Sequence, residues 1–258
     1  MGGSGRLLIL TPLKDAAHHL DVYFRGLRTL TYPRDRISIG FLESDSVDGT
    51  YERLTDELTA LAAAFHRATL CKRDFGFRIP TDQPRYANHL QVQRRSLLAK
   101  SRNHLLFNAL ADEDWVLWLD ADVIEYPPDI IERLLATGKD VVHPNCVRDY
   151  GGPSFDLNAW RRRGGWHRHA LHHLHDLRCE GDLVPLDSVG GTMLLVRADV
   201  HRDGLVFPSF PYGLRNSKIR TNNHWLGELE TEGFGIMAAD MGVQCWGMPN
   251  LEIRHHPS

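Results

Sequence analysis

The chain has 258 residues, of which 42% are hydrophobic and 24% are charged, and its formal net charge is −3. This length and composition suit one large globular domain with a sizeable core, and the small net charge argues against a nucleic-acid partner. No stretch approaches 18 uncharged apolar residues, so the sequence predicts no transmembrane helix.

Strands and helices are predicted to alternate through the first 146 residues. Short apolar runs indicate buried strands, and apolar residues at helical spacing indicate helices. In chain order the predictions are a strand at 6–12, a helix at 15–30, a strand at 37–43, helices at 51–66 and 94–111, a strand at 115–123, a helix at 128–136 and a strand at 140–146. Residues 71–93 are expected to be irregular. This order predicts a mostly parallel, doubly wound, Rossmann-like α/β sheet that binds ligands at the carboxyl ends of its strands.

The remaining residues have a weaker pattern. Strands are predicted at 191–197 and 243–249, and a helix closed by Gly242 at 230–242. A long loop at 204–226 contains Asn216, Asn222 and Asn223; it either closes over a ligand or simply connects two elements. Because no linker or repeat interrupts the chain, we expect a single domain.

The cysteines and the amino terminus are typical of a cytoplasmic protein. The four cysteines are scattered and form no CxxC pair, which favours free thiols. The first residues, MGGSGRLLILTPLKD, lack the basic flank, apolar length and cleavage site of a signal peptide. We therefore expect a cytoplasmic protein and leave open a peripheral location at the inner face of the membrane and self-association.

Two acids follow the most apolar predicted strand. Asp120 and Asp122 flank Ala121 directly after WVLWL. Residues two apart in a strand point to the same side, so these carboxylates are expected to share one divalent cation, Mn²⁺ or Mg²⁺. Such a cation stabilises the charge on a departing nucleoside diphosphate. The alternative is that the acids only cap the next turn.

Polar residues also follow the first two predicted strands. Thr11, Pro12 and Lys14 follow the first strand, where Lys14 either meets a phosphate as a point charge or is merely solvated. Asp45 and Ser46 follow the second strand, where they either bind a base or ribose or form an ordinary turn.

Four more positions are candidates on the same grounds. Arg102 lies on the helix before the acidic triplet and is expected to reach a diphosphate or to pair with an acid of the site. Gly190 and Gly191 permit either a close approach of the backbone to a ligand or a tight turn. Asp187 precedes them and is a candidate for binding the sugar or acceptor.

These landmarks in this order resemble the A-type glycosyltransferases. The closer resemblance is to the fungal Golgi α-1,6-mannosyltransferases, the mannan polymerase subunits, and it spans about residues 7–256. The matching segments are LILTPLKDA (8–16), RDRISIGFLESDS (34–46), WVLWLDADV (115–123), HPNC (143–146), FDLNAW (155–160), DSVGGTMLLVRADVHRDG (187–204), ETEGFG (230–235) and GMPNLEIRH (247–255). The expected lack of an anchor suits a bacterial relative, and the unmatched residues 161–182 leave the identity of the acceptor open.

The resemblance implies an A-type fold, a GDP-mannose donor, Mn²⁺ and retention of the α configuration. It implies that about residues 1–146 bind the nucleotide sugar and about 147–258 bind the acceptor, which is a glycan, a lipid-linked or a small molecule. It also implies that Asp45 contacts the nucleoside and that His255 is a metal ligand beside Asp120 and Asp122. His256 is an alternative ligand. The remaining alternative is that His255 is only a surface histidine of the carboxyl-terminal tail.

The resemblance further places two acids, Glu230 and Glu232, where A-type enzymes have acids facing the acceptor. In inverting enzymes an acid there is the general base, whereas in a retaining enzyme it orients hydroxyl groups. Acids are also common in a first helical turn for electrostatic reasons alone.

Other functions remain open at this point. A glycosyltransferase with another nucleotide-sugar donor, or a sugar nucleotidyltransferase, would use a similar sheet. A nucleotidyltransferase, however, needs a glycine-rich basic loop after the first strand, and TPLKDAAHH lacks one. A non-catalytic subunit is a further alternative. A zinc hydrolase is suggested only by a histidine cluster without an HExxH pattern, formed by His167, His169, His172, His173 and His175.

Overall fold

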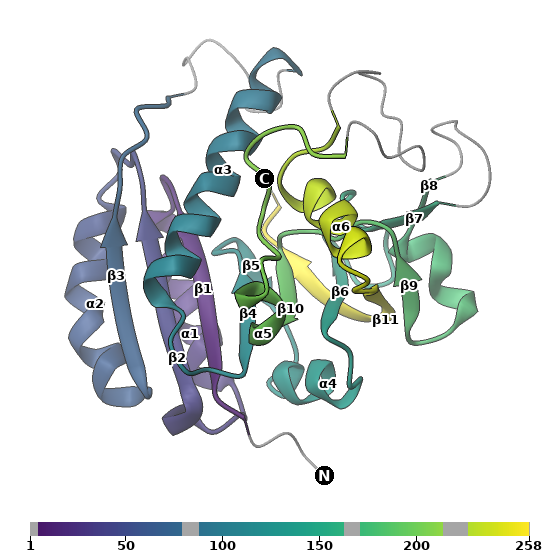
Figure 1. Cartoon of the computed structure of the whole chain (residues 1–258). Helices are drawn as coiled ribbons and strands as arrows, with labels where there is room; N and C mark the ends of the chain where they lie inside the picture. Colours follow the sequence, from purple (N-terminus) through teal and green to yellow (C-terminus); the bar gives the residue numbers. More distant parts are fainter. Residues whose placement is uncertain (1–4, 79–87, 163–170, 214–226, 258) are drawn as a thin grey trace.

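The computed structural model describes residues 5–78, 88–162, 171–213 and 227–257 (Figure 1). Within them a sheet of nine strands has the order β3-β2-β1-β4-β10-β6-β11-β5, and β9 pairs with β11. The strands are β1 (Leu7–Leu13), β2 (Ile37–Glu43), β3 (Arg67–Lys72), β4 (Trp115–Leu119), β5 (Val123–Glu125), β6 (Val141–Val147), β9 (Val184–Leu186), β10 (Met193–Arg197) and β11 (Cys245–His255).

The sheet is parallel in its first half and mixed in its second. Strands β3, β2, β1 and β4 run parallel, as predicted. Strand β10 runs antiparallel between β4 and β6, and β11 is parallel to β6. Because β10 is reversed, its beginning lies at the same edge as the end of β4, which brings residues 190–192 beside the acidic triplet.

Helices cover both faces of the sheet (Figure 1). They are α1 (Leu20–Thr29), α2 (Thr50–Ala64), α3 (Asn88–Ala109), α4 (Ile130–Ala136), α5 (Ala198–Arg202) and α6 (Glu230–Asp240), with short 3₁₀ turns at Ala17–His19, Arg34–Arg36 and Leu174–Glu180. Alternate residues of β1 point to opposite faces. Leu7 and Ile9 therefore pack in the core under α1, α2 and α4, whereas Leu8 and Leu10 pack in the core under α3, α5 and α6.

The strand predicted at 115–123 is interrupted, which corrects one step of the sequence argument. Strand β4 ends at Leu119, and a turn closed by the hydrogen bond from Val123 N to Asp120 O (3.2 Å) precedes β5. Asp120 and Asp122 are therefore not alternate residues of one strand. Their side chains have different neighbours.

Several elements are absent from the sequence predictions. Strand β3 is an edge strand that is only half buried, so it lacks the apolar run of a central strand. The last strand continues to His255 past a register shift between Met248 and Glu252. A hairpin of β7 (Trp160–Arg162) and β8 (Leu171–His173) forms its own small sheet. No helix among the described residues has both the length and the apolar character to cross a membrane.

Candidate functional site

The candidate site lies at the carboxyl edge of the sheet between β1 and β4. The strand order 3-2-1-4 changes direction there, because β2 and β3 extend to one side of β1 and β4 lies on the other. Ligands of doubly wound folds bind at this kind of switch point. The turn at residues 120–122 is placed at this edge directly by β4.

Asp122 and His255 lie together on one side of this turn. His255 Nε2 is 3.1 Å from Asp122 Oδ2, because the end of β11 pairs with β5 and places His255 opposite Val123. The imidazole stacks on Phe155, with ring centroids 3.8 Å apart. Burial alone would lower the pKa of His255, but the hydrogen bond and charge of Asp122 outweigh it and raise that pKa.

Asp120 belongs to a different set of contacts. Arg102 of α3 reaches it with Nη2 (3.1 Å to Oδ1) and reaches Glu230 with Nε (3.1 Å to Oε1). Only 1% of the Arg102 side chain is exposed, and its guanidinium lies over the rings of Trp118 and Phe207. Partial burial and the charges of nearby carboxylates raise the pKa of Asp120 to about 7, although Arg102 acts in the opposite direction.

Asp156 fixes the beginning of β10. Its Oδ2 accepts hydrogen bonds from Gly191 N (2.9 Å), Thr192 N (3.2 Å) and Thr192 Oγ1 (3.1 Å), and its Oδ1 accepts one from Asn158 N (3.2 Å). Burial would raise the pKa of Asp156, but the imidazole of His143, with Nε2 3.7 Å away, and the backbone donors hold it well below the usual range.

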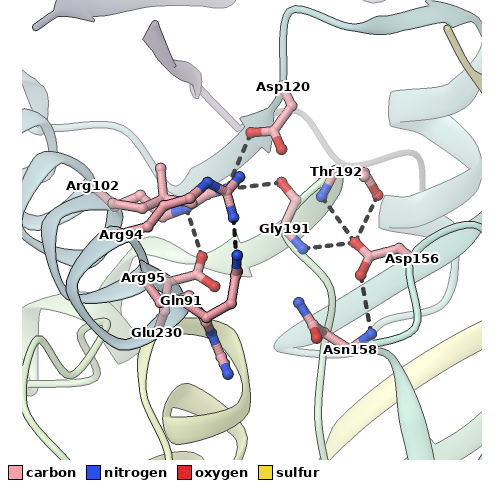
Figure 2. Close-up of a pocket in the computed structure, with 11 residues that line it drawn as sticks. Gln91, Arg94, Arg95, Arg102, Asp120, Asp156, Asn158, Gly191, Thr192 and Glu230 are labelled. Atoms are coloured by element: carbon pink, nitrogen blue, oxygen red, sulfur yellow. Dashed lines mark hydrogen bonds and ion pairs between the residues drawn. The ribbon is translucent and has the colours of Figure 1, made fainter. Parts of the chain in front are cut away.

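Arg102, Asp120 and Asp156 are among the residues that line a polar cavity of about 330 Å³ (Figure 2). Its wall includes arginines and amides of α3, the acids Asp120, Asp156 and Glu230, and the start of β10. The residues are Gln91, Arg94, Arg95, Leu98, Arg102, Asp120, Asp156, Asn158, Gly191, Thr192 and Glu230. Cationic guanidinium groups suit phosphate, while carboxylates and amides suit the hydroxyl groups of a sugar.

The two predicted glycines have a clear steric reason. A Cβ on Gly190 would overlap the Asp156 carboxylate, and a Cβ on Gly191 would lie 2.5 Å from Arg102 Nη2. Protein side chains therefore make the close approach at these positions. Asp187, by contrast, is exposed and accepts a hydrogen bond from Arg162 N (2.7 Å).

The predicted residues after the first strand are largely structural in their contacts. Thr11 is fully buried and its hydroxyl bonds Tyr23 Oη (2.6 Å) and Leu119 O (2.8 Å). Pro12 lies within β1 opposite Leu42. Lys14 is exposed, and its Nζ donates to Phe77 O (2.5 Å).

Asp45 and Ser46 organise neighbouring loops. The Asp45 carboxylate accepts hydrogen bonds from Phe75 N and Gly76 N, both 2.9 Å, and Ser46 Oγ accepts one from Asp15 N (2.9 Å). Asp45 has a positive φ of 56°, a backbone conformation that Asp tolerates better than most residues. These loops border the carboxyl ends of β1 and β2.

The acids at the start of α6 are both paired. Glu230 is buried, and Oε2 accepts a hydrogen bond from Thr231 Oγ1 (2.9 Å) in addition to the Arg102 pair. Glu232 pairs with Arg95 (2.8 Å) and accepts a hydrogen bond from Trp160 Nε1 (3.3 Å).

Glu228 adjoins this pair and was missed in the sequence. It is buried, and burial together with the charge of Glu232 raises its pKa to about 8, against the opposing charge of Arg95. Asp156, Asn158 and Arg95 were also missed as site residues. FDLNAW was noted only as a shared segment, and no spacing rule connects it with the acidic triplet.

The histidine cluster does not form a metal centre in the part that can be described. His167 and His169 lie outside the described residues, as do Asn216, Asn222 and Asn223. His175 Nδ1 accepts a hydrogen bond from Ser154 N (3.1 Å). Among the described residues, no three His, Cys, Asp or Glu side chains converge as a ready metal site, and the Asp120 carboxylate pairs with Arg102.

Comparison with known proteins places this chain in a family. The family model Anp1 matches residues 2–176 and 165–211. The Mannan polymerase II complex anp1 subunit of Schizosaccharomyces pombe is 32% identical over 97% of this chain and 64% of its own length. The Mannan polymerase II complex ANP1 subunit of Saccharomyces cerevisiae is 31% identical over 97% of this chain and 55% of its own length. The chain thus spans less than two thirds of either relative.

Solved structures share the fold at low sequence identity. The mannosyltransferase PcManGT from Pyrobaculum calidifontis, solved with GDP-Man and Mn²⁺, is 15% identical with a TM-score of 0.57, over 98% of this chain and 57% of its own. GalNAc-T7, solved with UDP, GalNAc and Mn²⁺, is 12% identical with a TM-score of 0.54, over 98% of this chain and 44% of its own. The chain therefore has the A-type glycosyltransferase fold, and it belongs to the Anp1 family.

Proposed function

We propose that this chain is a metal-dependent glycosyltransferase that transfers mannose from GDP-mannose with retention of the α configuration. The observation that carries the proposal is the pair of Asp122 and His255, 3.1 Å apart at the carboxyl edge of the sheet. The arginine-lined cavity opens beside the same turn, at Asp120. A cation site next to a phosphate-binding and hydroxyl-binding cavity is what a nucleotide-sugar donor requires.

Asp122 and His255 are the residues that would hold Mn²⁺ or Mg²⁺. A carboxylate oxygen and an imidazole nitrogen are both ligands that Mn²⁺ accepts. The residues fit the ion, because their facing atoms already make a hydrogen bond that a cation can replace. Asp120 is the third candidate, and Arg102 competes for its carboxylate. When bound, the cation supplies charge stabilisation for the departing diphosphate.

The donor is proposed from the family and from the cavity. Arg94, Arg95 and Arg102 line the cavity, and their positive charge favours a diphosphate there. The relatives are named as mannan polymerase subunits, and the mannosyltransferase that shares the fold was solved with GDP-Man and Mn²⁺; together these names support a GDP-mannose donor.

Retention is favoured by the contacts of the cavity acids. An inverting transferase needs a carboxylate that is able to take the proton of the acceptor hydroxyl. Among the described acids that line the cavity, Asp120 and Glu230 share Arg102, and Asp156 accepts hydrogen bonds from three backbone N–H groups and one hydroxyl. Glu230 and Asp156 are therefore engaged in contacts that leave them poor candidates for that base, and Asp120 is assigned to the metal and diphosphate end of the site.

The acceptor is proposed to be a sugar hydroxyl of a glycan, a lipid-linked sugar or a small glycoside. Asn158 and Gln91 add amide groups to the cavity wall, and amides both donate to and accept from hydroxyls. The relatives are named as subunits of complexes, which supports a second protein as a partner.

Slow hydrolysis of nucleotide sugars tests the proposal without knowledge of the acceptor. A panel containing GDP-mannose, GDP-glucose, UDP-glucose and UDP-GlcNAc is incubated with the protein and Mn²⁺ or EDTA. We expect GDP-mannose to be cleaved and EDTA to stop it. Asp122→Asn should lower the rate about 100-fold or more, since even outer partners of metal ligands contribute 10- to 100-fold to affinity.

Asp129→Asn is the matched control. Asp129 is also an aspartate at the end of a loop, but it pairs with Arg133 on the surface at the start of α4. The Asp129→Asn protein should hydrolyse the donor at the wild-type rate. Hydrolysis that survives both EDTA and Asp122→Asn would overturn the metal assignment, and cleavage of a UDP-sugar alone would overturn the donor. Turnover of a nucleoside triphosphate with a sugar phosphate would indicate a nucleotidyltransferase instead.

A further inference from the structure

We propose that Asp156 is a positioning residue that sets the Asp120 carboxylate through the first residues of β10. The inference deepens the proposed function, because it concerns how the metal and diphosphate end of the site is held in place. Asp156 is 36 positions from Asp120 in the sequence, and the connection between them runs through hydrogen bonds of the described residues (Figure 2).

The first link joins Asp156 to the backbone of β10. Its Oδ2 accepts from Gly191 N and Thr192 N, at 2.9 and 3.2 Å, and from Thr192 Oγ1 at 3.1 Å. One carboxylate oxygen therefore fixes two successive peptide groups. Gly190 is a glycine because this carboxylate occupies the space that a Cβ would need.

The second link joins the same two residues, Gly191 and Thr192, to the acidic turn through their carbonyl oxygens. Asp120 N donates to Thr192 O (2.9 Å), which fixes the backbone of Asp120. Arg102 Nη2 donates to Gly191 O (3.3 Å) and also contacts Asp120 Oδ1 (3.1 Å), which fixes the side chain of Asp120. The carbonyl oxygens of the two residues held by Asp156 thus determine where Asp120 and its guanidinium partner lie.

The charge of Asp156 suits this role better than a neutral side chain does. It is buried, and hydrogen bonds from N–H groups to a carboxylate are stronger than those to a neutral amide oxygen. His143 lies behind it with Nε2 3.7 Å from Oδ2, so the carboxylate is enclosed between an imidazole and the β10 backbone. An asparagine could accept with only one of its two side-chain atoms.

The test compares Asp156→Asn with Ser154→Ala. Ser154 lies in the same segment and is also buried. Its hydroxyl donates to Asn145 Oδ1 (2.7 Å) and accepts from His175 N (3.1 Å), so Ser154→Ala removes buried hydrogen bonds outside the proposed connection. Thr192→Val removes one contact of Asp156, the one from the Thr192 hydroxyl, and is the milder variant if Asp156→Asn does not fold.

Two measurements are made on each folded variant. The first is the affinity for GDP in the presence of Mn²⁺, by calorimetry. We expect Asp156→Asn to lose about 10- to 100-fold, as for other outer partners of metal ligands, Thr192→Val to lose less, and Ser154→Ala to match the wild type. The second is amide hydrogen exchange in the metal-free protein, where Asp156→Asn should speed exchange at Asp120, a residue whose hydrogen bonds do not involve Asp156.

The outcomes separate this inference from the proposed function. If the wild type binds GDP regardless of Mn²⁺, the proposed metal site fails, while the exchange at Asp120 still tests the connection. If Asp156→Asn binds Mn²⁺ and GDP as Ser154→Ala does, or leaves exchange at Asp120 unchanged, Asp156 is a structural residue of its own segment and the inference is overturned.

Discussion

The two sides of the turn at residues 120–122 differ in what they offer a ligand. On one side, Asp122 faces an imidazole, and both groups can exchange their hydrogen bond for a cation. On the other side, Asp120 faces a buried guanidinium that also holds Glu230 and lies against two aromatic rings. Two acids separated by one residue thus have different neighbours, because the chain turns between them.

This difference suggests a division of labour. Asp122 and His255 are suited to bind a metal, whereas Arg102, Asp120 and Glu230 form a network that fixes the wall of the cavity. The network connects α3, β4 and α6, and Asp156 connects it to β10. A variant that weakens the Arg102 network should leave the pair of Asp122 and His255 intact, and the reverse should also hold.

Arg102→Met should have the largest effect, on stability. It keeps an apolar side chain near Trp118 and Phe207 but leaves Asp120 and Glu230 without their cation. Breaking a buried ion pair in this way typically costs about 3–5 kcal/mol, so the urea midpoint should fall steeply. Arg133→Met is the control, since its exposed pair with Asp129 contributes about 1 kcal/mol or less. Equal midpoints for the two variants would show that the Arg102 network is not structural.

His255→Phe should affect the other side alone. The phenyl ring can keep the stack on Phe155 while the metal-binding nitrogen is lost. We expect the affinity for Mn²⁺ with GDP to fall at least about 10-fold, or about 1.4 kcal/mol, with little change in the thermal midpoint. His256→Phe is the matched variant, because the His256 ring lies near His19 instead, with centroids 4.9 Å apart. A larger loss in His256→Phe would exchange the roles of these histidines.

Glu228→Gln should have the smallest effect, a change in how stability depends on pH. Glu228 lies beside the pair of Arg95 and Glu232, so this variant extends the comparison to that part of the site. The pKa of Glu228 is raised to about 8 in the folded protein, so its contribution to stability is full below its unfolded pKa and is lost as pH rises toward 8. The free energy of unfolding of the wild type should therefore fall as the pH rises from about 5 to 8, because folded Glu228 keeps a proton that the unfolded chain has already lost.

The Gln variant carries no titrating proton at this position and should have a flatter profile. Chemical unfolding at pH 5, 6, 7 and 8 measures the difference between the two proteins. Glu57→Gln, which alters an exposed pair with Arg28, should keep the wild-type slope. Parallel profiles for wild type and Glu228→Gln would mean that Glu228 is ionised throughout this range.

The first half of the fold could be predicted from the sequence because its signals are local. Apolar runs gave β1, β2, β4 and β6, and periodicity gave the helices between them. The edge strand β3 was not predicted, because it is only half buried and therefore lacks a continuous apolar run. The antiparallel direction of β10 could not be predicted, because it depends on the connections through the irregular second half of the chain. No local sequence pattern there indicates the direction of a strand.

The site was predicted in its parts but not in its arrangement. The acidic triplet follows from its place after an apolar strand, whereas His255 came only from resemblance, since no spacing links it to a residue 133 positions earlier. The pair of Arg102 with Glu230, 128 positions apart, and the enclosure of Asp156 arise from tertiary packing. The prediction that Asp120 and Asp122 are alternate residues of one strand is wrong, because β4 ends at Leu119, before both of them.

Binding of Mn²⁺ in the presence of GDP tests the central claim most directly. Free Mn²⁺ is followed by its electron paramagnetic resonance signal as protein is added, for wild type, Asp122→Asn and Asp129→Asn. We expect wild type and Asp129→Asn to deplete the free ion and Asp122→Asn to lose affinity about 100-fold or more. Undiminished binding by Asp122→Asn, or no depletion of Mn²⁺ by the wild type, would contradict a metal site at Asp122 and His255.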